Sequence, residues 1–285
     1  MSSDPEINTC GIASTTARIQ GGNDTEPGEF PWAAALMRQK NEKPFCGASV
    51  IAPQFVLTAA HCLSNEDKKE VTVRLGAHTI KPNEDPEPES RDFEIENWMI
   101  HNDYEFPIND VAVIKLKSKI EYSDSIRPIC LPLEEYQIEP GKNITVIGWG
   151  YFIFRGDRAQ VLQKVVLKAI SNEQCADEYV NDTKIASSMF CTKTLNKGHC
   201  PGDSGGAAMI RNSKKQWAVV GVVSGNWGCG KRDIQYPDYY PRIDEYLDWI
   251  RTAMRLMRDD VSEPTESMIN RFFQLFFNFL KNNKV

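Results

Sequence analysis

The sequence predicts an all-β protein whose many short strands close or stack into sheets, followed by one clear helix. Short runs rich in β-branched and aromatic residues recur between residues 48 and 224, and turn-forming residues separate many of them. These runs are ASVI, FVLT, VTVRL, DVAVIKL, NITVIGWG, VLQKVVLKAI and QWAVVGVVS. Almost no long helical period interrupts them, which is the pattern of closed or stacked β structure.

The predicted helix follows the last of these strands. Apolar residues recur there at helical spacing, at Ile243, Leu247, Ile250 and Met254. One stripe of this helix should therefore pack on the body of the protein. Beyond it, residues 259–265 form a polar, proline-containing linker before a second and strongly apolar segment.

That second segment, residues 268–280, contains nine apolar residues. On a helix its polar residues fall along one stripe, formed by Asn270, Arg271, Gln274 and Asn278. The segment is too short and too interrupted to span a bilayer, so we expect an apolar helical tail that something covers. Three alternatives are open: packing on its own domain or on a second copy, binding at a membrane surface helped by Arg271, Lys281 and Lys284, and disorder or removal.

The composition is that of a soluble globular protein. With 285 residues, of which 41% are hydrophobic and 25% charged, the chain can bury a large core and has no disordered or collagenous bias. Its net charge of −6 leaves no basic footprint for nucleic acid. We therefore do not expect nucleic acid as a partner.

The cysteines and sequons point to the extracellular space. Eight cysteines form an even set without a CxxC pair or a zinc-like Cys/His spacing, so we expect disulfides, which persist outside the reducing cytosol. Asn-x-Thr sequons occur at Asn23, Asn143 and Asn181, as in a secreted glycoprotein. The first ten residues contain no apolar run, so secretion is inferred from these features and not from a signal peptide.

Three short motifs supply the groups that a serine nucleophile needs. His61 lies in AAHC, Asp110 lies in NDVA, and Ser204 lies in the glycine-rich GDSGG loop. Alone, the histidine could be structural and the glycine-rich loop a simple turn. Together they provide a hydroxyl, a base to take its proton and an acid to hold that base in the useful tautomer.

The motifs TAAHC, NDVAVIKL, GWG and GDSGG stand in an order that resembles the chymotrypsin and trypsin family, across residues 19 to about 250. The resemblance implies two antiparallel β-barrels with the site in the cleft between them. It implies His61 as general base and acid, Asp110 as the carboxylate that orients it, and Ser204 as nucleophile. The backbone N–H groups of Gly202 and Ser204 would form the oxyanion hole. Proteins or peptides would be the substrates, and neither a cofactor nor a metal is expected.

Two other functions compete with this one. The pentapeptide also fits the GxSxG elbow of α/β-hydrolases, but those enzymes carry serine first and histidine last, and they alternate strands with helices. The second competitor is a noncatalytic binding homologue of the same fold. The presence of all three triad residues argues against it.

The segment that begins at Arg18 resembles the family's activation site, where cleavage frees an apolar amino terminus. The resemblance implies that the ammonium of Ile19 inserts beside Asp203, whose buried carboxylate would otherwise lack a partner. It divides the chain into an activation peptide at 1–18, a protease domain at 19–258 and a linker with the tail at 259–285. An activating protease and protease inhibitors are the implied partners.

The resemblance also implies three disulfides, Cys46–Cys62, Cys175–Cys191 and Cys200–Cys229. Cys10 and Cys130 remain, and pairing them would tether the activation peptide to the body after cleavage. Eight cysteines allow about 105 arrangements, so the connectivity is an implication of the family alone.

The residues of the substrate pocket depart from the family pattern. Gly198 stands at the pocket base, where trypsin-like members carry aspartate, and Asp238 stands at a wall position that is usually glycine. Asp238 could face a basic substrate side chain, or it could pair internally with His199 and favour small or aliphatic side chains; both alternatives are open. The segment that binds substrate backbone reads Ser224-Gly225-Asn226 in place of Ser-Trp-Gly, which puts the apolar shelf for extended substrates in doubt.

The acidic stretch KPNEDPEPES falls in a loop where some family members bind calcium. Ala77 stands where those members offer their first glutamate, and the prolines restrict wrapping. We therefore expect a solvated acidic loop and no metal.

Overall fold

The computed structural model describes residues 10–13, 23–40, 43–81, 84, 86–132, 137–152, 156–179, 184–226, 229 and 236–258. The predicted activation site at Arg18 and Ile19, the sequon at Asn181 and the whole predicted tail lie outside these residues, as does the side chain of Asn23.

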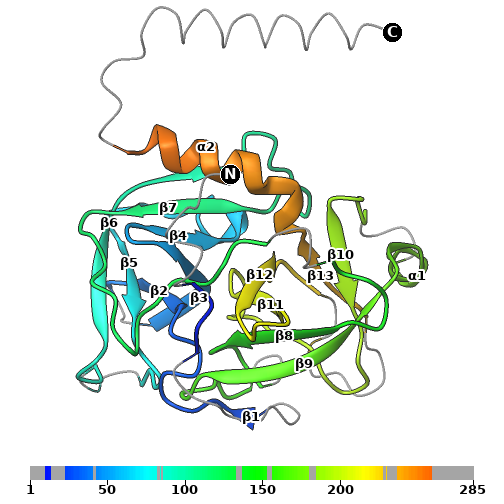
Figure 1. Ribbon diagram of the computed structural model, residues 1–285, viewed down its shortest axis with the longest axis horizontal. Helices are drawn as coiled ribbons and strands as arrows, with labels where there is room; N and C mark the ends of the chain where they lie inside the picture. The colour runs from blue at the N-terminus through cyan, green and yellow to red at the C-terminus, as the bar shows by residue number, and fades with distance from the viewer. Residues whose placement is uncertain are drawn as a thin grey trace, which may run out of the picture.

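A closed antiparallel barrel forms the first half of the protein (Figure 1). Its strands pair in the order β2-β3-β4-β7-β6-β5, and β5 returns to β2, where Ala34 lies opposite Leu75. The strands are β2 Ala33–Arg38, β3 Lys43–Ala52, β4 Phe55–Thr58, β5 Val71–Leu75, β6 Arg91–Ile100 and β7 Ala112–Leu116. Strand β5, with the sequence VTVRL, alternates fully buried with half-buried residues, so one face lines the barrel core.

The second half is a seven-stranded antiparallel sheet with the order β12-β11-β8-β9-β10-β13, in which β1 joins β9 at the side. It curves into a half-closed barrel, and a single bridge between Gly221 and Arg242 connects β12 to the segment after β13. The strands are β1 Asn23–Asp24, β8 Asn143–Gly148, β9 Gln163–Ile170, β10 Met189–Thr192, β11 Ala207–Arg211, β12 Trp217–Val222 and β13 Asp238–Pro241. The predicted all-β, two-barrel architecture is confirmed.

Helices are few in the described chain and lie outside the barrels. The helix α1, Asn172–Glu178, begins after Ser171, whose hydroxyl caps it by accepting from the backbone N–H of Gln174 at 3.1 Å. The helix α2, Leu247–Leu256, follows the 3₁₀ turn Ile243–Tyr246 and packs against the first barrel beside β7 (Figure 1). Ile243 and Ile250 are fully buried, which confirms the predicted apolar stripe. No helix among the described residues is long and apolar enough to cross a membrane.

Four disulfides brace the fold: the three that the family resemblance implies, and the remaining pair, Cys10 with Cys130. They join Cys10 to Cys130, Cys46 to Cys62, Cys175 to Cys191, and Cys200 to Cys229.

The short N-terminal segment around Cys10 docks through its backbone as well as its disulfide. Gly11 donates to the carbonyl of Pro128 at 2.8 Å and accepts from the N–H of Trp217 at 2.9 Å. Gly11 has a φ of +66°, and a Cβ there would lie 2.2 Å from the Trp217 carbonyl. Only glycine fits this contact. The segment is held by the disulfide, by the two backbone hydrogen bonds of Gly11 and by a hydrogen bond from Gln216 Nε2 to the Cys10 carbonyl.

Candidate active site

His61 and Asp110 form the best-defined part of the site. His61 lies in the 3₁₀ turn Ala60–Cys62, directly after β4, and Asp110 immediately precedes β7. The His61 backbone N–H donates to Asp110 Oδ1 at 2.8 Å, and His61 Nδ1 lies 2.8 Å from Asp110 Oδ2. Because an ionised carboxylate only accepts hydrogen bonds, this contact places the ring proton on Nδ1 and leaves Nε2 with its lone pair.

The Asp110 carboxylate is fully buried and has a third donor. The hydroxyl of Ser224 donates to Asp110 Oδ2 at 2.5 Å. Ser224 was predicted to lie in the substrate pocket, and no local motif indicates this bond. A buried carboxylate that accepts three hydrogen bonds is held in one orientation, and it holds the imidazole ring in turn.

Asn109 aims Asp110 into the site. Its φ of +55° lies in the left-handed region, which asparagine tolerates better than most residues. Its side chain is fixed at both ends, because Nδ2 donates to the Asp103 carbonyl at 2.8 Å and Oδ1 accepts from the Tyr246 hydroxyl at 3.0 Å. The asparagine of the NDVA motif therefore holds the backbone turn that orients Asp110.

The Ser204 loop of the second barrel presses against the first barrel. The Gly47 N–H donates to the Ser204 carbonyl at 2.7 Å. Gly205 has a φ of +81°, and a Cβ there would lie 2.3 Å from both the Gly47 carbonyl and the Thr58 hydroxyl. Glycine after the predicted nucleophile is thus required for the two barrels to meet.

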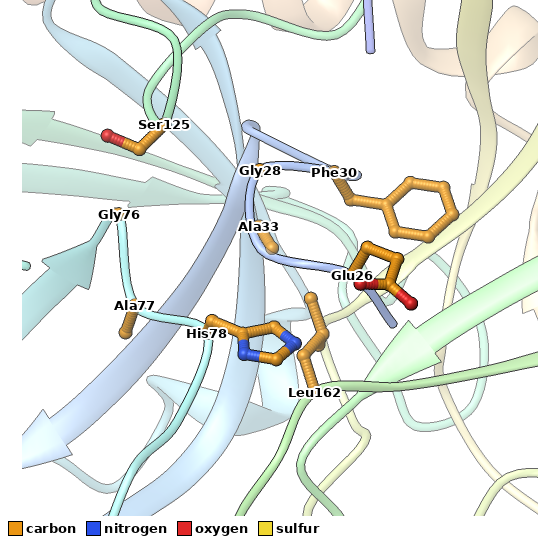
Figure 2. Close-up of a pocket in the computed structure, with 9 residues that line it drawn as sticks. All are labelled: Glu26, Gly28, Phe30, Ala33, Gly76, Ala77, His78, Ser125 and Leu162. Atoms are coloured by element: carbon orange, nitrogen blue, oxygen red, sulfur yellow. The ribbon is translucent and has the colours of Figure 1, made fainter. Parts of the chain in front are cut away.

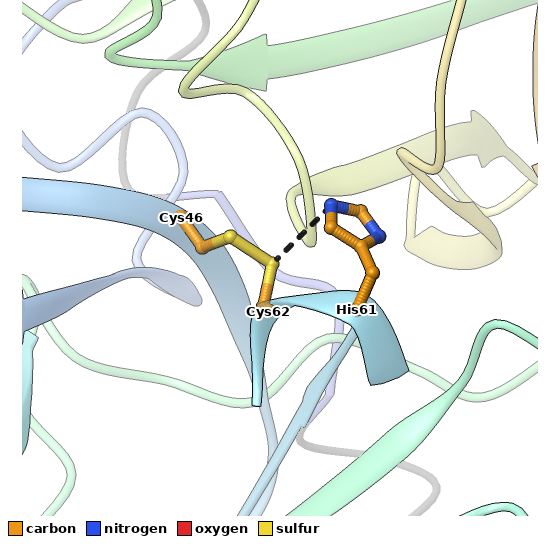
Figure 3. A group of neighbouring side chains, drawn as sticks. All are labelled: Cys46, His61 and Cys62. Carbon is orange, nitrogen blue, oxygen red and sulfur yellow. Dashed lines mark hydrogen bonds between the residues drawn. A yellow bond between two sulfur atoms is a disulfide. The ribbon is translucent and has the colours of Figure 1, made fainter. Parts of the chain in front are cut away.

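The Cys46–Cys62 disulfide lies between the Ser204 loop and His61. His61 Nε2 lies 3.8 Å from Cys62 Sγ (Figure 3), and the same sulfur lies 3.3 Å from the position of a Gly205 Cβ. Among the described residues, no hydrogen bond joins the Ser204 hydroxyl to His61. Catalytic hydrogen bonds are often long before substrate binds. Cys46, His61 and Cys62 cluster closely, but both sulfurs are in the disulfide and offer no thiolate to a metal.

Asp203, next to Ser204, is held by the GWG motif. Its carboxylate accepts from the backbone N–H groups of Gly150 at 2.7 Å and Cys200 at 2.9 Å. A Cβ at Gly148 or Gly150 would lie 2.1 or 2.5 Å from carboxylate atoms, so both glycines are needed for this approach. Burial raises the pKa of Asp203 to about 6, although the two backbone donors and the charge of Arg158 lower it.

Arg158 is the cation that the described structure places near Asp203. Its Nε donates to the Trp149 carbonyl at 2.7 Å, and its Nη2 lies 3.5 Å from the carbonyl of Gly202. Arg158 was not predicted to belong to the site, because the carbonyl groups that it reaches come together only in the folded chain.

At the predicted pocket base, the carboxylate of Asp238 lies beside Gly198. A Cβ at Gly198 would lie 3.0 and 3.1 Å from the two carboxylate oxygens. Asn226 reaches across, and its Nδ2 donates both to Asp238 Oδ1 and to the His199 carbonyl at 2.6 Å. Asp238 is therefore engaged by other protein groups, with Asn226 as its closest side-chain partner.

The His199 ring and the Asp238 carboxylate lie close together without a hydrogen bond between them. His199 Nε2 lies 3.7 Å from Asp238 Oδ1, and this buried nitrogen has no hydrogen-bond partner among the described residues. Burial lowers the pKa of His199 to about 3 and raises the pKa of Asp238 to about 8. Both groups thus favour their neutral forms near pH 7. Asp238 has Asn226 and the His199 backbone N–H as hydrogen-bond partners, and whether it also faces substrate stays open.

The acidic loop closes on itself. Glu87 accepts from the backbone N–H groups of His78 at 2.6 Å and Thr79 at 3.0 Å, so this carboxylate is already engaged. A separate pocket nearby is lined by Glu26, Gly28, Phe30, Ala33, Gly76, Ala77, His78, Ser125 and Leu162 (Figure 2). None of these residues belongs to the predicted site, and His78 Nε2 is bonded to the Thr25 carbonyl at 2.7 Å. Of the sequons, Asn143 is exposed at the start of β8.

The comparisons with known proteins agree with this architecture. The family model described as Trypsin matches residues 19–250. The chain is 35% identical over 260 residues to Transmembrane protease serine 11C of Mus musculus, covering 88% of this chain and 58% of that protein. It is 31% identical over 242 residues to Venom serine protease 34 of Apis mellifera, covering 82% of this chain and 58% of that protein. It is 32% identical over 272 residues to CLIP domain-containing serine protease B10 of Anopheles gambiae, covering 88% and 74%.

The chain spans 58% of the length of the mouse and honeybee relatives. The matched region contains both barrels and every residue of the candidate site. The chain belongs to the trypsin family of serine proteases.

Proposed function

We propose that this protein is a serine endopeptidase that hydrolyses peptide bonds through an acyl-enzyme. The observation that carries the proposal is the buried Asp110 carboxylate bonded to both the backbone and the ring of His61. That arrangement leaves the lone pair on His61 Nε2, which faces the Cys46–Cys62 disulfide against which the Ser204 loop packs. A histidine so oriented is suited to act as a base.

The proposed reaction needs no group beyond the chain and water. His61 Nε2 takes the proton of the Ser204 hydroxyl as its oxygen attacks the substrate carbonyl, and the same proton passes to the departing amine. Water then attacks the acyl-enzyme with His61 again as base. The ester bond to Ser204 breaks, the new carboxylic acid leaves, and His61 returns the proton to the Ser204 oxygen. The N–H groups of Gly202 and Ser204 stabilise the oxyanion, and losing one such donor typically costs about 3–4 kcal/mol of barrier lowering.

A fluorophosphonate reagent tests the proposal directly. We expect it to label Ser204 in the cleaved protein, with Ser204→Ala as the unlabelled control. Failure to label a correctly cleaved and folded protein would instead favour the noncatalytic homologue. Such a homologue could still bind peptides.

We propose that activation occurs by cleavage between Arg18 and Ile19. Asp203 supports this step, because burial raises its pKa and a new ammonium beside it would stabilise the ionised form. The Cys10–Cys130 disulfide would then keep the activation peptide attached. Arg18→Gln should block activation by a trypsin-like protease, whereas full activity of this uncleaved variant would refute the step.

We also propose an extracellular location, supported by the disulfides and by the exposed sequon at Asn143. Activating proteases and protease inhibitors would be its partners there.

The predicted tail should be dispensable for chemistry, because the family match ends at residue 250. Truncation after Arg258 should leave peptide hydrolysis nearly unchanged while altering oligomer size or lipid binding. A large loss of turnover in the folded truncated protein would contradict this.

A further inference from the structure

A short hairpin from Gly150 to Ala159 lies against the loop that precedes Ser204. The Ala159 N–H donates to the Gly150 carbonyl at 2.9 Å, and Tyr151 pairs with Arg158 as its antiparallel partner. The Arg158 guanidinium also lies over the Tyr151 ring, with Cζ 5.6 Å from the ring centroid. Backbone pairing and ring contact together hold the Arg158 side chain in one place.

The first arm of this hairpin fixes the peptide unit between Pro201 and Gly202. The Tyr151 N–H donates to the Pro201 carbonyl at 3.0 Å. Because the carbonyl and the N–H of a trans peptide point in opposite directions, this bond turns the Gly202 N–H away from the hairpin. Among the described residues, neither the Gly202 N–H nor the Ser204 N–H donates to a protein acceptor. Both are therefore available to an oxyanion.

Arg158, on the second arm, contacts the next peptide unit. Its Nε donates to the Trp149 carbonyl at 2.7 Å, and its Nη2 lies 3.5 Å from the Gly202 carbonyl oxygen. A Cβ on Gly202 would lie 2.6 Å from this Nη2 atom, so the guanidinium packs directly on the Gly202 backbone. Gly202 has a φ of +95°, which glycine adopts with little strain and also leaves easily. A contact from outside the loop is needed to hold it, and Arg158 provides one.

We propose that Arg158 is a positioning residue for the oxyanion hole, because its guanidinium braces the Gly202 backbone and so keeps the Gly202 N–H aimed at the oxyanion. The proposal rests on the proposed protease function and adds one residue to it. A planar guanidinium suits the task, since one N–H can bond to Trp149 while another lies against Gly202. The oxyanion forms only when the serine attacks, so a misdirected N–H weakens the transition state more than bound substrate.

Arg158→Leu tests this role, because leucine keeps part of the side-chain volume but offers no N–H group. Each variant is assayed after the activating cleavage, with a peptide amide substrate that the wild-type enzyme hydrolyses. We expect kcat to fall by about tenfold or more, while KM changes by less than about twofold. Arg158→Lys should recover only part of the loss, because an ammonium lacks the planar fork that spans both contacts.

Two inhibitors separate oxyanion stabilisation from ordinary binding. A peptide aldehyde adds the serine to its carbonyl and places an oxyanion in the hole, whereas the peptide alcohol of the same sequence has no carbonyl to attack. Arg158→Leu should weaken binding of the aldehyde by about tenfold or more and of the alcohol by less than about twofold.

Arg211→Leu is the matched control. Arg211 also lies over an aromatic ring, with Cζ 4.7 Å from the Trp217 ring centroid, and it ends β11 outside the candidate site. Its replacement should leave kcat and both inhibition constants unchanged.

Fluorophosphonate labelling of Ser204 in the cleaved wild-type protein is measured first, and its absence refutes the protease function itself. With labelling present, an unchanged kcat and aldehyde affinity in Arg158→Leu overturn only this inference. Equal losses for the aldehyde and the alcohol also overturn it, since Arg158 would then act on substrate binding. Tm shows whether Arg158→Leu folds. If it does not, Arg158→Gln, which can still donate to the Trp149 carbonyl, carries the same test.

Discussion

The two halves of the candidate site differ in how their carboxylates are satisfied. Asp110, before β7 of the first barrel, accepts hydrogen bonds from the His61 backbone, the His61 ring and the Ser224 hydroxyl. Asp203, in the second barrel, has two backbone donors, and burial still raises its pKa to about 6. The first half is thus complete within the described residues, while the second half would gain from an additional cation.

The predicted pocket follows the second pattern. Burial dominates the pKa values of both His199 and Asp238, and it drives both groups toward neutrality. The groups of the site whose pKa values burial shifts most therefore lie in the second barrel, in the loops that carry Ser204 and the predicted pocket. The first barrel supplies a base that is already oriented.

Asp110→Asn, which alters the first half of the site, should have the largest effect on activity. An amide in place of the carboxylate can donate to His61 Nδ1, which favours the wrong tautomer and removes the lone pair from Nε2. We expect kcat of the cleaved enzyme to fall by about 10⁴-fold with little change in KM. Titration of Ser204 with the fluorophosphonate gives the concentration of active enzyme, and Tm shows whether the variant folds. A loss below about tenfold would mean that the first half is not what orients the base.

Gly150→Ala should damage the second half alone. Its added Cβ would lie 2.5 Å from atoms of the Asp203 carboxylate, so the loop with Gly202 must shift. We expect kcat/KM to fall by about 10²–10³-fold, as for loss of an oxyanion donor. Gly141→Ala is the control, since its Cβ meets nothing within 4 Å and only its φ of +86° opposes it. Equal losses in the two variants would contradict the explanation.

Arg158→Ala tests the second half of the site through the pH dependence of stability. The experiment uses the Arg18→Gln variant, which stays uncleaved. Because the pKa of Asp203 is raised, the folded state binds more protons than the unfolded state between about pH 4 and pH 6. The stabilising contribution of protonated Asp203 is therefore present below pH 4 and lost as pH rises through 6. Asp203 is half-buried as a residue, so we expect a loss of about 1–2 kcal/mol after solvent screening.

Arg158→Ala should enlarge this loss, because the guanidinium stabilises the ionised carboxylate. The measurement is the free energy of unfolding in denaturant from pH 4 to pH 8. Asp203→Asn provides the reference from which the titration of this one group is obtained. The same pH dependence with and without Arg158 would show that the arginine does not influence the titration of Asp203.

Asp238 gives the smallest expected effect, seen in specificity. Its pKa of about 8 means that its negative charge appears as pH rises from 7 to 9. If the carboxylate reaches substrate, cleavage after lysine relative to leucine should increase by about tenfold over this range. Asp238→Asn should abolish the increase. A ratio that is independent of pH in the wild-type enzyme would mean that the bond from Asn226 keeps the carboxylate away from substrate.

Much of the fold was predictable because alternation and β-branched residues mark most strands. The strand β2 was not identified, since AAALMR consists of good helix formers. It is a strand because β3 and β5 pair with it on both sides and its small residues fit a closed barrel. Tertiary pairing, which no local pattern contains, overrides the local preference there.

The site divides in the same way. His61, Asp110 and Ser204 were predictable because each stands in a specific motif, and the structure brings the first two into direct contact. Arg158 was not, since the carbonyl groups that it reaches, those of Trp149 and Gly202, come together only in the folded chain. The hydrogen bond from Ser224 to Asp110 joins residues 114 positions apart and leaves no local signature.

The bond from Tyr246 to Asn109 has a consequence for the order in which the protein is made. Asn109 holds its left-handed conformation with the help of a hydroxyl that the ribosome adds 137 residues later. A nascent chain that has already produced His61, Asp110 and Ser204 still lacks this clamp. Trp249, which packs on His101 at 5.1 Å, arrives later still. A chain that ends before Tyr246 therefore contains every residue of the predicted triad but lacks the hydrogen bond that holds Asn109 and so orients the Asp110 carboxylate.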